Sequence, residues 1–305
     1  MGFKVLLVAG THGNEVNAPW LFDQWMECPD LIKTHNIEFC SVIGNPKARE
    51  VGRRYLDRDL NRSFNLDLLD AEFHKGYEIK RAKEMLNLYG KEGEIPCQLV
   101  IDFHSTTSSM GNSLVVYGRR PIDLALAALI QSKLGLPIYL HEEDNSQTGF
   151  MVSAWPSGLV VEIGPVPQGV LDAETINKTK ITLETLLKEI SNISKGEVYF
   201  PNQLVVHRHM KSIDYPRNKK GMVEAFVHPS RQGKDWSPIK KGDPLFLSFK
   251  GDVIRFDEED GCVPVFINEA AYLEKNIAMS LAKREVIEFS TEWELAIKNL
   301  IRVQY

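Results

Sequence analysis

The feature that most constrains the fold is an alternation of apolar strand-like runs with helix-like segments through the first two-thirds of the chain. Residues 5–9 are wholly apolar, as expected of a strand buried on both faces of a sheet. Similar runs lie at residues 37–43, 97–104, 113–117 and 159–163, and helical patterns at 18–26, 64–89, 121–134 and 168–193. This alternation predicts an α/β domain with a largely parallel, twisted sheet flanked by helices.

The pattern changes near residues 194–201, after which short strand-like runs separated by turn residues dominate. These runs lie at residues 203–207, 223–228, 245–249 and 263–267. Such a change predicts a second, smaller and mostly β domain. We therefore divide the chain of 305 residues into one domain at 1–197 and a β-rich domain at 198–305.

Composition argues against several classes of protein. The net charge of -5 provides no basic field, so no nucleic-acid partner is expected. No apolar run has the length of a membrane span and no signal-peptide pattern is present, so we expect a cytoplasmic protein without a membrane partner. The four cysteines are scattered, which is typical of reduced thiols. The sequence does not determine the oligomeric state, and a homo-oligomer is compatible with it.

The turn at residues 10–15, GTHGNE, follows the first predicted strand. His12 and Glu15 are three residues apart, so a turn puts both side chains on one side. An imidazole and a carboxylate so placed can hold a catalytic zinc ion, although a loop histidine beside an exposed glutamate gives the same pattern. His104 ends the run at 97–104 and is a candidate third ligand. Ligands bind beyond the carboxyl ends of strands in open α/β sheets, so these side chains converge if their strands are parallel neighbours.

Glu162 lies in the apolar run at 159–163, where an ionised carboxylate is costly to bury without a partner. A nearby zinc ion or zinc-bound water would be such a partner, and Glu162 could then take a proton from that water. A strand-end glutamate that is exposed or paired with an arginine is the alternative. Asp102 lies two positions before His104 and faces the same side of the strand. It can accept the second ring N–H of a zinc-bound histidine, or bind a loop amide instead.

Five arginines fall within residues 49–62, which is unusual in an acidic chain. Guanidinium groups bind carboxylates through two parallel hydrogen bonds and stay charged at all ordinary pH values. The segment therefore favours an anionic substrate, although some of these side chains are expected to be solvated. The five are Arg49, Arg53, Arg54, Arg58 and Arg62.

Two other groups of ionisable residues are interpreted as ordinary structure. His207 and His209 share one face of a predicted strand, but no carboxylate or cysteine partner is evident beside them. Residues 141–144, HEED, are interpreted as a solvated loop. Neither group is assigned a metal.

Together these motifs resemble the aspartoacylase/succinylglutamate desuccinylase family, a branch of the zinc carboxypeptidase-like fold. The matching stretches run in order across nearly the whole chain and are jointly far more specific than any one of them. They are GTHGNE at 10–15, NPKA at 45–48, RYLD at 54–57, DLNRSF at 59–64, DFHSTTSSMG at 102–111, VEIGP at 161–165, PQGVL at 167–171, DYPR at 214–217 and PVFINEAAY at 264–272. The resemblance implies a mixed, largely parallel sheet flanked by helices, and a C-terminal β domain that shapes a substrate channel.

The resemblance also implies catalytic roles. One Zn²⁺ per subunit is held by His12, Glu15 and His104, with water in the open position. Glu162 matches the general base and proton shuttle of the family. Arg54 matches the arginine that polarises the scissile carbonyl and stabilises the oxyanion.

Substrate binding is implied at four further positions. Asn61 and Arg62 match residues that grip the carboxylate of a small anionic N-acyl amino acid. Tyr272 matches a tyrosine that the C-terminal domain adds to the substrate pocket, and Lys275 matches a basic residue near the channel.

One departure from the family bears on the substrate. Vertebrate-type aspartoacylases carry an arginine that reads the aspartate side chain, and Phe150 stands where that arginine is expected. No arginine occurs between Arg120 and Arg208. The leading hypothesis is zinc-dependent hydrolysis of N-acetyl-L-aspartate to acetate and L-aspartate. The alternatives are a deacylase of N-acyl aromatic amino acids or mercapturates, as in aminoacylase 3, and a non-catalytic protein that binds a metal or a small molecule.

Overall fold

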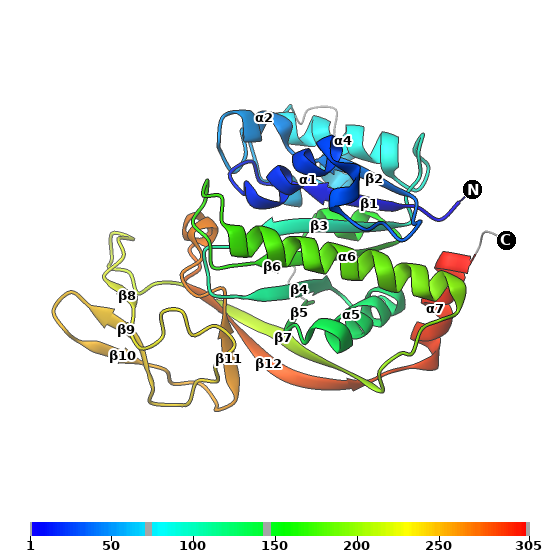
Figure 1. Ribbon diagram of the computed structural model, residues 1–305. Coiled ribbons are helices and arrows are strands. Elements are labelled where there is room, and N and C mark those ends of the chain that lie inside the picture. Colours follow the sequence, from blue (N-terminus) through cyan, green and yellow to red (C-terminus); the bar gives the residue numbers. More distant parts are fainter. Residues whose placement is uncertain (1, 71–74, 143–147, 303–305) are drawn as a thin grey trace.

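The computed structural model describes residues 2–70, 75–142 and 148–302 (Figure 1). Within these residues a nine-stranded sheet has the order β11-β12-β7-β5-β4-β6-β3-β1-β2, and a three-stranded sheet has the order β10-β9-β8. The strands are β1 (Val5–Ala9), β2 (Phe39–Ile43), β3 (Leu99–Ser105), β4 (Asn112–Tyr117), β5 (Ile138–His141), β6 (Ser157–Ile163), β7 (Gln203–Ile213), β8 (Ala225–Val227), β9 (Pro244–Ser248), β10 (Val253–Arg255), β11 (Cys262–Val265) and β12 (Met279–Glu288).

Helices cover both faces of the large sheet (Figure 1). The first core cluster joins α1, α5, α6 and α7 to one face, and a second joins α4 to the other. The α-helices are α1 (Asn17–Glu27), α2 (Pro46–Glu50), α3 (Leu66–Asp70), α4 (Tyr77–Tyr89), α5 (Pro121–Leu134), α6 (Ala173–Lys195) and α7 (Thr291–Arg302). Short 3₁₀ helices are η1 (Pro29–Leu31), η2 (Leu60–Arg62), η3 (Met151–Ala154) and η4 (Ala270–Lys275).

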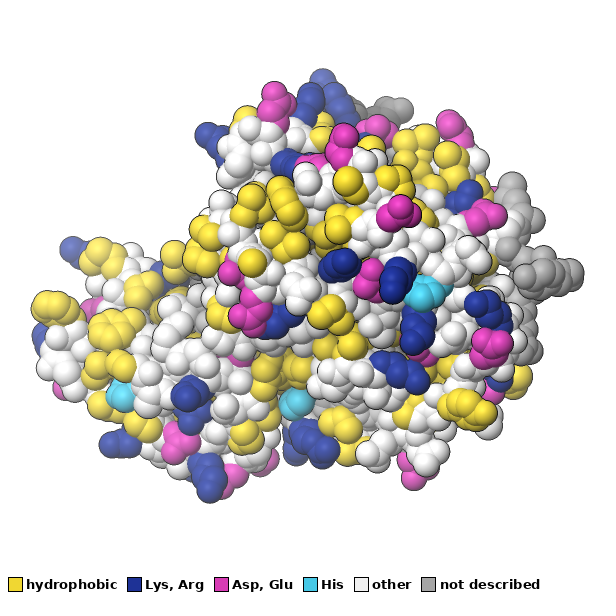
Figure 2. Space-filling view, viewed as in Figure 1, with side chains coloured by type: hydrophobic (Ala, Val, Ile, Leu, Met, Phe, Trp, Pro, Cys, Tyr) yellow, Lys and Arg dark blue, Asp and Glu magenta, His cyan; other side chains and the backbone are white. Residues whose placement is uncertain are grey.

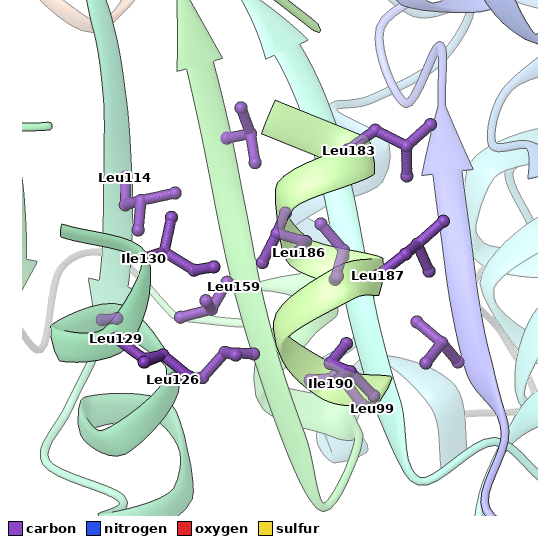
Figure 3. Close-up of a cluster of buried hydrophobic side chains, with 14 of the residues drawn as sticks. Leu99, Leu114, Leu126, Leu129, Ile130, Leu159, Leu183, Leu186, Leu187 and Ile190 are labelled. Carbon is purple, nitrogen blue, oxygen red and sulfur yellow. The ribbon is translucent and has the colours of Figure 1, made fainter. Parts of the chain in front are cut away.

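The long helix α6 shows how the sequence pattern produces this packing. Its apolar residues recur at helical spacing, so they form one stripe that faces the sheet. Figure 3 shows Leu183, Leu186 and Leu187 from this stripe against the strands that carry Leu99 and Leu159. All five side chains are almost completely buried, and burying each contributes about 2 kcal/mol to stability.

The parallel neighbours that the sequence suggested are present. Strand β1 pairs in parallel with β2 and β3, and β3 pairs in parallel with β6. Strand β4 runs antiparallel to β6, and β12 runs antiparallel to β7 and β11, so the sheet is mixed. The predicted architecture, a largely parallel sheet flanked by helices with a smaller antiparallel sheet in the C-terminal part, is confirmed.

The C-terminal part of the chain contributes to both sheets. Strands β7, β12 and β11 extend the large sheet, and α7 places Trp293, Ile297 and Ile301 in the core beside α5 and α6. The small sheet packs on a third core cluster that includes Phe246 and Phe256. The division at residues 197 and 198 stays a prediction.

Several expected elements differ in the structure. The helix expected within residues 64–89 is present as α3 and α4, because Gly76 precedes α4 in an extended conformation. Helix α6 begins after Asp172, whose carboxylate accepts the Thr175 N–H at 2.7 Å and caps the helix. Strands β5, β10 and β12 and helix α7 were not predicted. Strand β12 and helix α7 pack against elements distant in the chain, whereas β10 pairs with the neighbouring β9.

The surface carries charges of both signs. On the face shown in Figure 2, basic and acidic side chains are interspersed, in agreement with the small net charge. Among the described residues, no helix is both long and apolar enough to cross a membrane.

Candidate active site

Three parallel strands end at the same edge of the large sheet and deliver ionisable side chains there. His104 on β3 is in register with Glu162 on β6, so the two side chains point to the same side. Strand β1 lies on the other flank of β3 and leads into the loop that carries His12 and Glu15. The convergence expected from the sequence is therefore observed.

The loop after β1 is held close to the arginine-rich segment. The N–H of Gly13 donates to the carbonyl of Arg54 at 3.1 Å. A Cβ atom at Gly13 would lie 2.2 Å from the carbonyl carbon of Ala48, so no larger residue fits this approach. This contact brings the two sequence motifs of the site together.

His12, Glu15 and His104 form a compact, buried cluster. The Nδ1 atoms of His12 and His104 are 3.1 Å apart. One carboxylate oxygen of Glu15 lies 2.6 Å from His12 Nδ1, and the other lies 3.0 Å from His104 Nδ1. The potential ligand atoms of the three residues lie within 4.8 Å of one another. Two imidazole nitrogens and a carboxylate facing one point are the donor set of an open catalytic zinc site.

The outer nitrogens of both imidazoles contact carboxylates. His104 Nε2 lies 2.6 Å from Asp102, which also accepts the Thr11 hydroxyl at 2.7 Å. His12 Nε2 lies 3.0 Å from Asp59. Such carboxylates fix the tautomer of a metal-binding histidine, with the inner nitrogen left as a ligand. The residues present therefore fit a zinc ion, and the second role considered for Asp102, binding a loop amide, is not the one observed.

The charges of the cluster shift its pKa values strongly. Burial by itself would raise the pKa of Glu15, but His12 and His104 lower it well below its usual value. Burial likewise opposes charge on His104, yet Asp102 and Glu15 raise its pKa well above the usual range. The same balance, dominated by His12, holds the pKa of Asp59 low. The carboxylates of this cluster therefore favour a positive charge placed among them.

Glu162 lies beside this cluster but is in a different electrostatic environment. Its half-buried side chain faces a small cavity, and no side-chain hydrogen bond from the described residues offsets its loss of water. Burial raises its pKa to about 8, against the opposing influence of His104 and Arg54. A carboxyl group with a pKa near neutrality can both accept and donate a proton.

The five arginines of residues 49–62 have different positions. Arg54 lies 3.3 Å from Glu15 and 3.4 Å from Asp59, and its buried Nε–H has no hydrogen-bond partner among the described residues. Arg62 also faces the cavity beside Glu162. Arg49 pairs with Asp23, Arg53 is exposed, and Arg58 donates to the carbonyl of Arg62 at 3.4 Å. Only Arg54 and Arg62 of this set line the cavity at the metal cluster.

The C-terminal part completes the wall of this cavity. Tyr272 lines it, and Lys275 lies 3.5 Å from Asp59 at its outer side. Glu269 joins the two parts of the chain, since one of its oxygens accepts the N–H groups of Thr107 at 2.8 Å and Ser108 at 3.1 Å. Residues more than 160 positions apart are therefore locked together beside His104.

Three cavities meet at Arg62. The metal cavity, about 30 Å³, is lined by His12 and Glu15 of the cluster, by Glu162 and by Tyr272. The aromatic cavity, about 20 Å³, is lined by Arg62, Val115, Tyr117, Tyr139, His141, Phe150, Glu162, Phe266, Tyr272 and Ser280. The outer basin, about 900 Å³, carries the basic residues Arg58, Arg62, Arg208, Lys211 and Lys275. Anionic ligands would thus meet positive charge on the way to the metal cavity.

Comparison with known families supports the sequence resemblance. The description "Succinylglutamate desuccinylase/Aspartoacylase catalytic domain" matches residues 1–190, and "AstE/AspA barrel-sandwich hybrid domain" matches residues 202–284. The chain belongs to the succinylglutamate desuccinylase/aspartoacylase family.

Individual members of this family are similar over their full length. A "Probable aspartoacylase" of Prochlorococcus marinus is 59% identical over 303 residues, which cover 98% of this chain and 99% of the relative. Another, of Parasynechococcus marenigrum, is 50% identical over 298 residues, 97% of this chain and 98% of the relative. The crystal structure of murine aminoacylase 3 has a TM-score of 0.86 and 32% identity, covering 94% of this chain and 97% of that one. A succinylglutamate desuccinylase from Vibrio cholerae shares the fold at a TM-score of 0.63 and 15% identity.

Sequence reasoning missed several residues of this family site. Asp59 contacts His12, although its place between arginines gave only a weak signal. Glu269 lies in a family motif, but its contact with the loop after β3 was not foreseen. The interpretation of residues 141–144 as a solvated loop is wrong for His141, which is buried at the end of β5 and lines the aromatic cavity. Glu142 pairs with Arg119 at 2.8 Å, and positions 143 and 144 lie outside the described residues.

The pair on β7 also has structural partners. His209 Nδ1 lies 2.6 Å from the hydroxyl of Tyr139, and the ring of His207 lies 5.0 Å from that of Trp236.

Proposed function

We propose that this family member is a zinc-dependent hydrolase of the amide bond of N-acyl amino acids, with N-acetyl-L-aspartate as the first candidate substrate. Acetate and L-aspartate would be the products. The observation that carries the proposal is the buried His12, Glu15 and His104 cluster with Glu162 beside it. The names of the cyanobacterial relatives support the choice of substrate.

The chain's own residues account for each step of the reaction. Zinc bound by His12, Glu15 and His104 would supply Lewis acidity toward water and the acyl carbonyl. Glu162 accepts a proton from the attacking water and passes it to the amide nitrogen as the C–N bond breaks. Its raised pKa suits this exchange, and a nearby dication would lower that pKa toward neutrality. Arg54, whose Nε–H has no acceptor in the described part of the chain, donates to the developing oxyanion.

Substrate binding would use the groups between the three cavities. Arg62 binds the α-carboxylate of the substrate through its guanidinium group. Asn61 assists through its side-chain N–H₂, because its amide oxygen already accepts the N–H of Met151 at 3.0 Å. Tyr272 and Lys275 form the C-terminal wall of the channel, which gives the β-rich part after residue 198 a role in substrate access.

The test is a Glu162→Ala variant assayed for acetate release from N-acetyl-L-aspartate. We expect turnover to fall by at least about a thousandfold, because the proton shuttle is lost, while the zinc content measured by atomic emission stays at one per chain. Glu84→Gln, a change at an exposed glutamate on α4, is the control. Substantial turnover by Glu162→Ala would rule out its role as base.

A second candidate substrate class is favoured by the aromatic cavity. Phe150, Tyr117 and Phe266 surround space that adjoins Glu162 and Arg62, and such walls suit an aromatic side chain. Because the cavity is about 20 Å³, the walls would have to move apart to admit a ring. The resemblance to murine aminoacylase 3 agrees with this alternative. Comparing kcat/KM for N-acetyl-L-aspartate and N-acetyl-L-tyrosine decides between the two. A zinc-loaded protein that hydrolyses neither, with no chelator-sensitive activity across a panel of N-acyl amino acids, would instead be a non-catalytic binder.

A further inference from the structure

The guanidinium group of Arg62 packs against an aromatic ring, and one of its N–H groups donates to the carbonyl of Asn61 at 3.2 Å. Its guanidinium carbon lies 3.9 Å from the centroid of the Phe150 ring. This is close contact for a cation on an aromatic face. Arg62 also borders all three cavities, so a small change in its direction would move its N–H groups from one cavity toward another.

The Phe150 ring is itself held in place by a second aromatic ring. It stacks on Tyr117 with a centroid distance of 3.7 Å and an interplanar angle of 28°. Its side chain is only 6% exposed. We call Tyr117, Phe150 and Arg62 the stack.

The backbone on both sides of Phe150 is tied to the segment that carries Arg62. The carbonyl of Gly149 accepts the N–H of Phe64 at 3.1 Å, and the N–H of Met151 donates to Asn61 at 3.0 Å. Gly149 has a φ of +78°, and a Cβ atom there would lie 2.9 Å from the carbonyl oxygen of Arg62. Phe150 is therefore fixed directly against Arg62 by contacts that any larger residue at position 149 would disturb.

A stacked guanidinium group is oriented in a specific way. Stacking occupies the flat face of the group, whereas carboxylate binding uses its edge in the plane. A ring that fixes the plane also fixes the direction of the edge and removes rotamer freedom before the substrate arrives. The ring thus prepares Arg62 without touching the reacting atoms.

We propose that Phe150 is a positioning residue, which holds Arg62 in the orientation that binds the substrate carboxylate. The identity of the ligand, a substrate carboxylate, rests on the proposed function. The claim that Phe150 orients Arg62 does not depend on that function. The effect falls on substrate binding, because Arg62 contacts the carboxylate in ground state and transition state alike.

The first experiment compares Phe150→Leu with Phe64→Leu in the zinc-loaded enzyme. Phe64 is a buried neighbour that packs on Trp155, so its substitution is matched in size and burial. We expect Phe150→Leu to raise KM for the better of the two N-acetyl substrates about tenfold, the scale of one lost cation–π contact, with kcat within about twofold. Phe64→Leu should leave KM unchanged. An unchanged KM in folded Phe150→Leu overturns the proposal.

A double-mutant cycle tests whether the effect passes through Arg62. In an Arg62→Gln background, which has no cation to stack on the ring, Phe150→Leu should have no further effect on KM. An equal effect in both backgrounds would show a general structural role and overturn the proposal. If Phe150→Leu does not fold, Phe150→Met serves as the second variant, since a methionine fills the space flexibly but offers Arg62 no aromatic face. It should raise KM in the same way, and an unchanged KM would again overturn the proposal.

A spectroscopic measurement keeps this inference separate from the proposed function. The Nε–H proton of Arg62, assigned by its loss in Arg62→Lys, should be shifted upfield by the ring current of Phe150. It should move downfield in Phe150→Leu, or in Phe150→Met, and stay in place in Phe64→Leu. If the wild-type protein hydrolyses no N-acyl amino acid, the proposed function fails, but this shift still decides whether Phe150 positions Arg62.

Discussion

Glu78 offers the sharpest test of how the arginine-rich segment is supported. This carboxylate lies in the first turn of α4 and is completely buried. One oxygen accepts the N–H of Leu56 at 2.7 Å and the side chain of Asn45 at 3.1 Å. The other accepts the N–H groups of Asp57 at 3.1 Å and Arg58 at 3.3 Å. Glu78 therefore holds three successive backbone N–H groups just after Arg54.

Glu78→Gln preserves the shape but replaces one oxygen by an N–H₂ group. If the N–H₂ group takes the place of the oxygen that faces Asp57 and Arg58, the backbone N–H groups of these two residues face a donor instead of an acceptor. Two hydrogen bonds are then lost. Each buried, unsatisfied donor costs about 1–3 kcal/mol. Asp57 is exposed and Arg58 half-buried, so water can reach these groups and the lower end applies. We expect a total loss of about 2 kcal/mol in the free energy of unfolding and a fall in Tm of about 4 °C.

The matched control is Glu84→Gln on the same helix. Glu84 pairs with Arg81 at 2.9 Å, but its side chain is 57% exposed. Exposed pairs contribute about 0–1 kcal/mol, so this variant should differ little from the wild type. Both variants are compared by urea unfolding and by calorimetry in the zinc-loaded state. We also expect kcat of Glu78→Gln to fall about tenfold, because Arg54 loses its support while the metal cluster is untouched.

A specific result would refute this reasoning. If Glu78→Gln and Glu84→Gln unfold at the same urea concentration, the hydrogen bonds to Glu78 do not stabilise the segment. If stability falls but kcat stays at the wild-type value, the position of Arg54 does not depend on Glu78.

Three further predictions follow from other parts of the structure. Glu269→Gln weakens the contact with the N–H groups of Thr107 and Ser108, and kcat/KM should fall at least about tenfold because the Tyr272 segment shifts; a wild-type kcat/KM would contradict this. Burial raises the pKa of Asp235 from 3.8 to about 6, so the folded protein keeps its proton longer than the unfolded chain and loses about 3 kcal/mol of stability as the pH rises from about 4 to about 6. Asp235→Asn removes this loss, so its free energy of unfolding relative to wild type should rise by up to that amount between pH 4 and pH 7, and an equal difference at both pH values would argue against it. Removing the metal with a chelator should lower Tm, and adding zinc should restore it. At a zinc concentration about a thousandfold above Kd, the free energy of unfolding should rise by about 4 kcal/mol. A Tm insensitive to both treatments would speak against a metal at His12, Glu15 and His104.

Local patterns in the sequence determined the arrangement of the metal cluster to a large extent. Buried parallel strands are recognisable from apolar runs, and their carboxyl ends meet at one edge of the sheet. His104 and Glu162 therefore had to come close once β3 and β6 were neighbours, and the turn after β1 needed only its own spacing to put His12 beside Glu15. These inferences succeed because each depends on chain direction or on neighbours within a few residues.

Local patterns did not decide which side chains surround that cluster: the family resemblance named Arg54 and Arg62, and the tertiary structure shows the contacts that place them. Nothing local distinguished Arg54 and Arg62 from the other arginines, because their direction is set by contacts with Glu15 and with Phe150. The same holds for Glu269, which accepts N–H groups from residues more than 160 positions away. Composition and spacing indicate which secondary structure a segment prefers. Which of several similar side chains lies at the site depends instead on packing between distant segments. The sequence by itself therefore determined how His12, Glu15 and His104 converge, and packing between distant parts of the chain determined which side chains surround them.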